Sequence, residues 1–130
     1  MATIRTIEQK RSEFALKCIE EVVKDKNISK DYKSLVKKFP MMVLKNGFLQ
    51  AVVFLESKGK EHHSRLLEHL KKYLTSVSPL KVRIDNDDLP KFLSSKVSIS
   101  EYRNITTDIL AFTKWLGRYA DALIEEEESG

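Results

Sequence analysis

Apolar residues recur every three or four positions along most of this 130-residue chain, and that spacing constrains the fold more than any other feature. It places the apolar side chains on one face of a helix. Only four Gly and three Pro are present, too few for a fold with many tight turns. We therefore predict an all-α fold, a compact bundle of about five to six helices. A single domain should span residues 1–130, with residues 125–130 as a frayed acidic tail.

Two capping boxes predict where the first and last helices begin. Thr6 with Gln9, and Ser98 with Glu101, have the spacing at which each side chain satisfies a backbone N–H of the other residue. A brief turn of helix is expected at residues 91–95 between them, after a polar loop bounded by prolines.

The middle of the chain is ambiguous. A short basic helix after Ser29 should be interrupted at Pro40, because proline restricts the residue before it. In residues 41–54, Asn46-Gly47 between apolar runs is a strong hairpin signal. The apolar residues of this segment nevertheless step at helical spacing through Gly47, which favours one continuous helix over the hairpin. These residues are Met41, Leu44, Phe48 and Ala51, and Leu55 continues the series just beyond the segment.

Charge is distributed unevenly along the chain. Residues 1–81 contain 17 Lys and Arg against 9 Asp and Glu, a net charge of +8, whereas residues 82–130 contain 6 against 10, a net charge of −4. A basic N-terminal part is compatible with a polyanionic partner. Cys18 is the single cysteine, which suits a reducing compartment, and no segment has the length of an apolar membrane span. We expect a cytoplasmic protein.

No catalytic or metal-binding constellation is recognisable. His62 and His69 are seven residues apart, about 10 Å along a helix, too far to share one ion, and we expect the histidines of this segment to be solvated. Residues 85–88 lack the glycine and the terminal glutamate of a calcium loop, so a capping or solvated loop is expected. Cys18 lies on an apolar stripe and should be buried and inert. We predict a non-enzyme without metal or cofactor.

The last helix shows a second face besides its core face. At 100° per residue, Lys114 and Arg118 fall within about 60° of Arg103 and lie nearly opposite the apolar residues. Leu110 and Trp115 flank this basic stripe, which suggests a contact surface for a partner. The alternative is a solvated charged face.

A second group of cations follows Ser29. It consists of Lys33, Lys37, Lys38 and, beyond the proline, Lys45. Lysines in such a group can bind phosphates as point charges, which gives affinity for nucleic acid without reading the bases. Here too a solvated helix surface is the alternative interpretation.

Three segments together resemble a known family. They are IEQKRSEFALKCIEEV, YKSLVKKFPMMVLKNGFLQAVVFLESKG and EYRNITTDILAFTKWLGRYADALI. The chain resembles the small all-helical subunit of the type III-B CRISPR-associated (Cmr) RNA-targeting effector complex, over nearly its whole length and in the same order. Members of that family often have a basic residue where Gly117 stands and a glycine where Leu49 stands, so those details are not carried over.

The resemblance implies a helical bundle and hence a helix at residues 41–54. It also implies a non-catalytic subunit, whose partners are the backbone and large subunits of the complex, copies of itself stacked in a filament, crRNA and target RNA. Two other classes compete with it. A helical protein–protein adaptor would explain Leu110 and Trp115 but not the basic excess. A small helical DNA-binding regulator would explain the charge, but no convincing recognition helix is visible.

Overall fold

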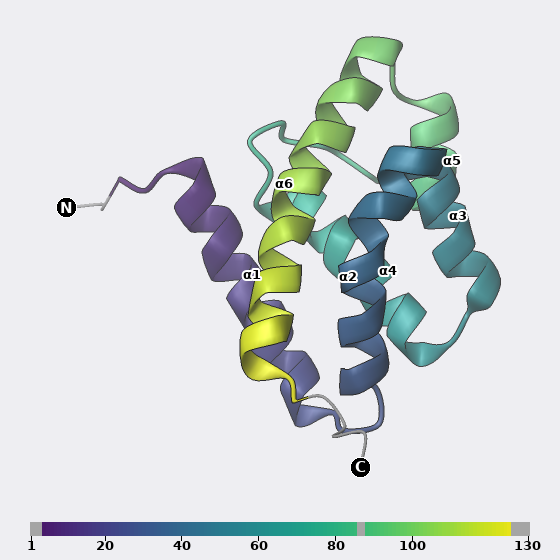
Figure 1. The fold of residues 1–130 in the computed structure, drawn as a ribbon. Coiled ribbons are helices and arrows are strands. Elements are labelled where there is room, and N and C mark those ends of the chain that lie inside the picture. Colours follow the sequence, from purple (N-terminus) through teal and green to yellow (C-terminus); the bar gives the residue numbers. More distant parts are fainter. Residues whose placement is uncertain (1–3, 86–87, 126–130) are drawn as a thin grey trace.

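The computed structural model describes residues 4–85 and 88–125, and within these ranges the regular secondary structure consists of six α-helices without a strand. The predicted all-α fold is therefore confirmed (Figure 1). The residues proposed as a frayed tail lie outside the described ranges, except for Glu125. The helices are α1 (Ile7–Lys24), α2 (Ser29–Asn46), α3 (Phe48–Lys58), α4 (Glu61–Ser76), α5 (Leu89–Ser95) and α6 (Ile99–Leu123).

The longest helix, α6, organises the bundle. It packs mainly against α1 and α2, while α4 packs against α2 and α3 (Figure 1). Because α2 and α6 run in opposite directions, the end of each lies beside the start of the other. Aromatic side chains fill much of the core between the helices, and each buried ring removes a large apolar area from water. The fully buried rings include Tyr32, Phe39, Phe48, Tyr73 and Phe112.

Both predicted capping boxes are present. The Thr6 hydroxyl accepts a hydrogen bond from the Gln9 backbone N–H at 3.0 Å, and the Gln9 side chain accepts one from the Thr6 N–H at 2.8 Å. Ser98 and Glu101 make the same reciprocal pair at 3.1 Å each. These bonds satisfy N–H groups that a helix leaves without an internal partner, and they therefore fix the starts of α1 and α6.

The predicted interruption at Pro40 is wrong, because α2 continues through this residue to Asn46. A proline inside a helix removes one backbone hydrogen bond and costs about 3 kcal/mol. Phe39 and Val43, on either side of Pro40, are both buried, and their burial offsets that cost.

The helical interpretation of residues 41–54 is confirmed, but the helix is not continuous. Gly47 has a φ of +89° and separates α2 from α3. A residue with a side chain would be strained at this φ, and its Cβ would lie 3.3 Å from the Tyr102 hydroxyl. That hydroxyl accepts a hydrogen bond from the Leu49 N–H at 2.9 Å, so the start of α6 holds the junction. No helix is long and apolar enough to cross a membrane in the described part of the chain.

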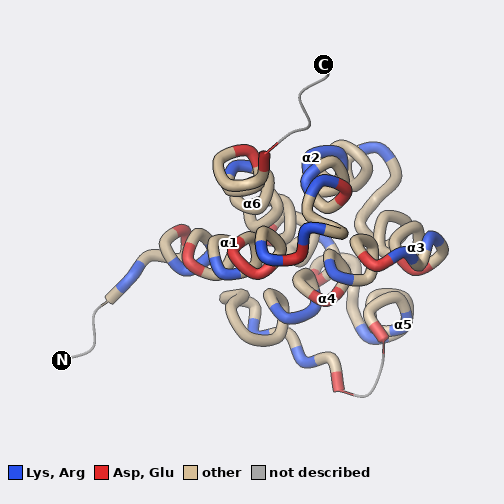
Figure 2. The backbone as a smooth tube through the Cα atoms, turned by 90° about the horizontal axis from the view of Figure 1, so that it is seen from below, with Lys and Arg blue, Asp and Glu red and all other residues tan. Residues whose placement is uncertain are grey.

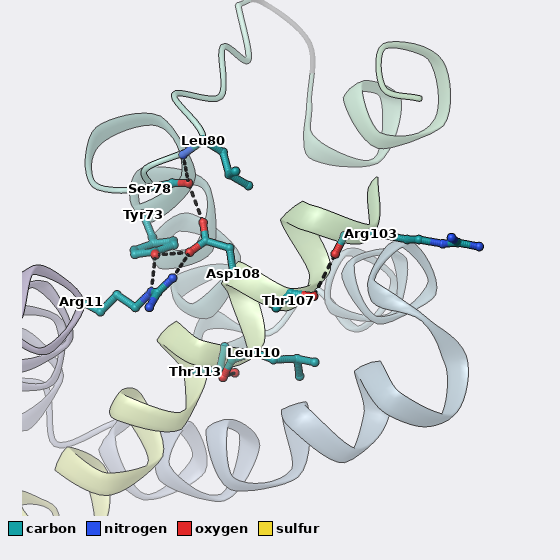
Figure 3. A network of polar contacts seen from close by, with 9 residues as sticks. All are labelled: Arg11, Tyr73, Ser78, Leu80, Arg103, Thr107, Asp108, Leu110 and Thr113. Carbon is teal, nitrogen blue, oxygen red and sulfur yellow. Dashed lines mark hydrogen bonds and ion pairs between the residues drawn. The ribbon is translucent and has the colours of Figure 1, made fainter. Parts of the chain in front are cut away.

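A buried carboxylate fastens α6 to the rest of the bundle (Figure 3). Asp108 Oδ1 accepts hydrogen bonds from Arg11 Nη2 at 2.8 Å and from the Tyr73 hydroxyl at 2.5 Å. Asp108 Oδ2 accepts one from the Ser78 hydroxyl at 2.5 Å, and Ser78 Oγ accepts one from the Leu80 N–H at 3.1 Å. One side chain of α6 thus holds α1, α4 and the connection that follows α4.

Candidate nucleic-acid interface

A shallow groove of about 240 Å³ lies between α2 and α6 and contains cations from both predicted basic groups. Lys37 comes from α2, whereas Lys114 and Arg118 come from α6, and all three are exposed. We call this the basic groove. Figure 2 shows the two helices side by side, with frequent cationic segments along α2. No local pattern predicts that the two groups meet, and the antiparallel packing of the helices brings them together.

Local structure explains why these cations face outward. Lys114 and Arg118 are four residues apart and therefore lie on one side of α6, while Leu116 on the other side is fully buried. On α2, the buried side chains of Val36 and Phe39 leave Lys37 at the helix surface. The core faces of the two helices thus position the basic groove.

The basic groove also contains one carboxylate, Asp121. Lys37 Nζ lies 2.9 Å from Asp121 Oδ1, and the hydrogen bond from Lys37 lowers the pKa of Asp121. Asp121 therefore carries a negative charge at neutral pH beside Lys37, Lys114 and Arg118. The side chains of the groove keep an excess of positive charge, which attracts phosphates.

Lys33 does not belong to this surface, although the sequence suggested it. Its side chain is buried, and Nζ donates a hydrogen bond to the Ile124 carbonyl oxygen at 2.8 Å, with Asp121 Oδ1 at 3.9 Å. The ammonium group therefore binds the carbonyl at the end of α6, where a cation is favourable. We interpret Lys33 as a structural residue and leave it out of the proposed interface.

The remaining predicted cations are exposed but lie outside the basic groove. Lys38 and Lys45 are on α2, and Arg103 is near the start of α6 with its side chain directed away from the Asp108 network (Figure 3). Eleven residues separate Arg103 from Lys114, about 16 Å along the helix. Since the end of α2 lies beside the start of α6, Lys45 and Arg103 are at the same end of this helix pair.

Trp115 and Leu110 do not form one surface. Trp115 lies in a separate groove of about 560 Å³ between α1 and α6, where its ring stacks on Tyr119 with centroids 6.0 Å apart. Glu8 and Glu13 of α1 also line this aromatic groove. Leu110 is half-buried and packs against the core. Of the two, only Trp115, on the side of α6 that faces α1, therefore lines an open groove.

Two apolar residues of α2 that the helical spacing places in the core are exposed. Met41 is 55% exposed and Leu44 is 67% exposed, although their spacing suggested core positions. The break at Gly47 explains the difference, because α3 no longer shares a face with the end of α2. Both residues lie on α2 between Lys37 and Lys45, so cations flank an apolar strip.

The histidines were predicted to be solvated, and for two of them that is wrong. His63 and His69 are buried, and His69 Nδ1 lies 2.6 Å from the Tyr32 hydroxyl. Burial lowers the pKa of His69 to about 4. Within the described residues, no group of three or more His, Cys, Asp or Glu side chains could hold a metal ion.

Two other sequence interpretations are confirmed. Cys18 is buried, and burial raises the pKa of its thiol to about 12, which keeps it protonated and unreactive. Asp88 caps α5 by accepting a hydrogen bond from the Lys91 N–H at 2.8 Å, as expected for this acidic loop. Residues 86 and 87 of the loop lie outside the described ranges.

Known proteins match this chain over nearly its whole length. The family model for the CRISPR-associated protein Cas_Cmr5 matches residues 7–123. The CRISPR system Cmr subunit Cmr5 of Thermus thermophilus is 29% identical over 125 residues, covering 95% of this chain and all of the relative. The Cmr subunit Cmr5 of Thermotoga maritima is 28% identical over 130 residues, covering 97% of this chain and 91% of the relative.

The fold is also similar to a solved structure. The crystal structure of a CRISPR-associated Cmr5 family protein from Thermus thermophilus superimposes with a TM-score of 0.76 and 29% identity. The similarity covers 94% of this chain and 100% of that chain. Since the family model spans all six helices from the start of α1 to the end of α6, this chain belongs to the CRISPR-associated Cmr5 family.

Proposed function

We propose that this protein is a non-catalytic small subunit of a cytoplasmic type III-B Cmr effector complex that acts in antiviral defence. In that complex it contacts the guide or target RNA through the basic groove. Family membership supports the assignment to a Cmr complex, since the relatives are described as Cmr subunits. The RNA contact is supported by the geometry of α2 and α6.

The convergence of Lys37, Lys114 and Arg118 in one groove carries the RNA-binding proposal. A solvated helix surface gives no reason for cations from two distant segments to line the same concavity. Neither Lys114 nor Arg118 makes an ion pair or hydrogen bond through its side chain with the described residues, so both can bind phosphates without breaking a contact. Lys38, Lys45 and Arg103 can extend the contact along the same helix pair.

Protein partners are assigned to a different surface. The aromatic groove around Trp115 and Tyr119 has the composition of an interface centre, because tryptophan and tyrosine contribute large apolar areas there. We propose that it contacts a backbone or large subunit of the complex, or a neighbouring copy of this chain in a stacked filament.

The test is a salt titration of reconstituted complexes that carry Lys114→Glu and Arg118→Glu together. Loss of two single-strand phosphate contacts should flatten the log–log salt dependence of target-RNA binding by about 1.4. The effect should be the same for unrelated target sequences, because phosphate contacts carry no base code. A matched control replaces the exposed Lys10 and Lys60 by Glu, with the same change in net charge outside the groove.

Stability serves as the second control. Both substituted groove positions are exposed, so each change should alter the free energy of unfolding by no more than about 0.5 kcal/mol. Target-RNA binding and a salt slope equal to those of wild type would contradict the RNA-binding proposal. The protein–protein adaptor would then be the better description.

A further inference from the structure

A third concavity, a cleft of about 510 Å³, lies where the connection between α4 and α5 passes beside the start of α6. Its apolar lining includes Phe92 and Ile105, which are buried, and Val82 and Val97, which are half-buried. The volume lies within the range of small-molecule sites. None of these residues contributes to the basic groove or to the aromatic groove.

The rim of this cleft is polar and carries three cations. Lys81, Arg83 and Lys96 line it and are exposed, and none of their side chains makes an ion pair with another described residue. Asn104 adds an amide that can both donate and accept hydrogen bonds. The cleft therefore combines an apolar floor with cations able to hold an anion.

Two carboxylates also line the cleft, and they differ in their availability. Glu101 Oε1 accepts the Ser98 N–H at 3.1 Å, and hydrogen bonding with Ser98 lowers the pKa of Glu101. Its carboxylate is thus part of the capping box of α6. The side chain of Asp85 is exposed and makes no hydrogen bond or ion pair with another described residue, so it can accept a hydrogen bond from a ligand.

The connection that carries Lys81 and Arg83 has an unusual backbone conformation at Lys81. Lys81 has a φ of +53° and is the one non-glycine residue with positive φ in the described ranges. Its N–H donates to the Ser78 carbonyl oxygen at 3.3 Å, while the Ser78 side chain binds Asp108 at 2.5 Å (Figure 3). A conformation that is unfavourable for lysine is thus held by the buried Asp108 network, as is typical of positions with a functional constraint.

We propose that this cleft binds one nucleotide of a single-stranded RNA. The base lies on the apolar floor, with its edge toward Asn104, and the adjoining phosphate lies among Lys81, Arg83 and Lys96. A ribose hydroxyl donates to the carboxylate of Asp85. The inference deepens the proposed function by adding a base-accepting site to the phosphate contacts of the basic groove, and it rests on that function for the source of the RNA.

The mixed lining favours a nucleotide over other anions. Inorganic phosphate would gain nothing from the apolar floor, and the carboxylates of an acidic peptide offer no hydrogen-bond donor to the carboxylate of Asp85. A ribonucleotide offers an apolar ring, an anion and hydroxyl donors in one ligand. The 2′-hydroxyl is also the group by which a carboxylate can distinguish RNA from DNA.

The experiment is a titration of the full-length, isotopically labelled protein followed by amide NMR. The probes are a pentauridylate RNA, the deoxyuridine strand of the same length, UMP and inorganic phosphate. We expect saturable shifts of the amides of residues 81–83, 96–97 and 104 with the RNA, and weaker binding of the DNA strand. UMP should produce the same pattern at higher concentration. Shifts reproduced by inorganic phosphate alone, or no saturable shift at these amides, would overturn the inference.

Neutralising variants separate this cleft from the basic groove. Arg83→Gln with Lys96→Gln should flatten the log–log salt dependence of RNA affinity at the cleft by up to about 0.7, the value for the one phosphate held there, whereas Lys10→Gln with Lys60→Gln should leave it unchanged. The groove variant with Lys114→Glu and Arg118→Glu should keep the cleft shifts. Two results are read separately. Cleft shifts that persist in the groove variant would support the inference. Normal target-RNA binding by the same variant would contradict the proposed role of the basic groove. Absence of cleft shifts with a functional groove would overturn the inference alone.

Discussion

Lys37 and Asp121 form an ion pair of 2.9 Å that joins α2 to α6 inside the basic groove. The pair places a carboxylate beside the cations proposed to bind RNA, and Lys33 Nζ lies 3.9 Å from the same oxygen atom. Asp121 therefore links the two helices and at the same time reduces the positive potential between them.

We expect Asp121→Asn to strengthen RNA binding. The substitution removes one negative charge from the groove, so a phosphate there meets less repulsion. A unit charge about 8 Å away in water changes affinity by about two-fold. Binding of the reconstituted complex to target RNA at low salt measures the effect. Glu56→Gln, an exposed position on α3, is the matched control, and equal affinities for both variants would contradict this prediction.

A cation can also be added to the basic groove, by substituting Gly117. It lines the basic groove within α6, and a Cβ added there would meet no atom within 4 Å. We expect Gly117→Arg to increase target-RNA retention, because it adds a fourth cation to the groove without a clash. The helix should also be stabilised by about 0.5–1 kcal/mol, because glycine is unfavourable in a helix.

Gly117→Ala separates the two effects of this substitution. It should raise the thermal midpoint as Gly117→Arg does, while leaving RNA retention at the wild-type level. If alanine and arginine increased retention equally, helix stability rather than charge would be responsible.

The Asp108 network should be essential for stability. Asp108→Ala leaves the hydroxyls of Tyr73 and Ser78 without their acceptor and the guanidinium of Arg11 without its anion. Breaking a buried charged network by removing one partner costs about 3–5 kcal/mol. Urea denaturation should therefore show a large fall in the free energy of unfolding. Glu56→Ala, which removes an exposed carboxylate, should change it by less than about 0.5 kcal/mol.

The helices were predictable from the sequence because their signals are local. The capping boxes at Thr6 and Ser98 depend on residues three positions apart, and the core face of α6 follows from the helical period alone. Lys114 and Arg118 follow from the same period, since they lie opposite the apolar face of α6, whereas Lys37 was predicted as one of a group of lysines after Ser29. Their meeting was not predictable, because it depends on how α2 packs on α6.

The errors concern residues whose environment is set by distant parts of the chain. Lys33 is buried because its ammonium group reaches the Ile124 carbonyl, 91 residues away. His69 is buried against Tyr32, 37 residues earlier. At Gly47, the hydroxyl of Tyr102 from α6 occupies the space that a Cβ would need. Periodicity identifies one buried face of a helix, but it contains no information on which neighbour covers a polar residue.

His69 should make the stability of the protein depend on pH. Burial lowers its pKa to about 4, whereas the unfolded chain should have a value near 6.5. As the pH falls from about 6.5 to about 4, the unfolded state binds a proton that the folded state excludes, so stability is lost in this window and is full above it. The loss attributable to His69 is at most about 3 kcal/mol.

His69→Gln keeps an acceptor for the Tyr32 hydroxyl but cannot titrate, and His63 is present in both proteins. Urea unfolding at several pH values should therefore show a shallower loss for the variant, and identical pH profiles would exclude His69 as the titrating group.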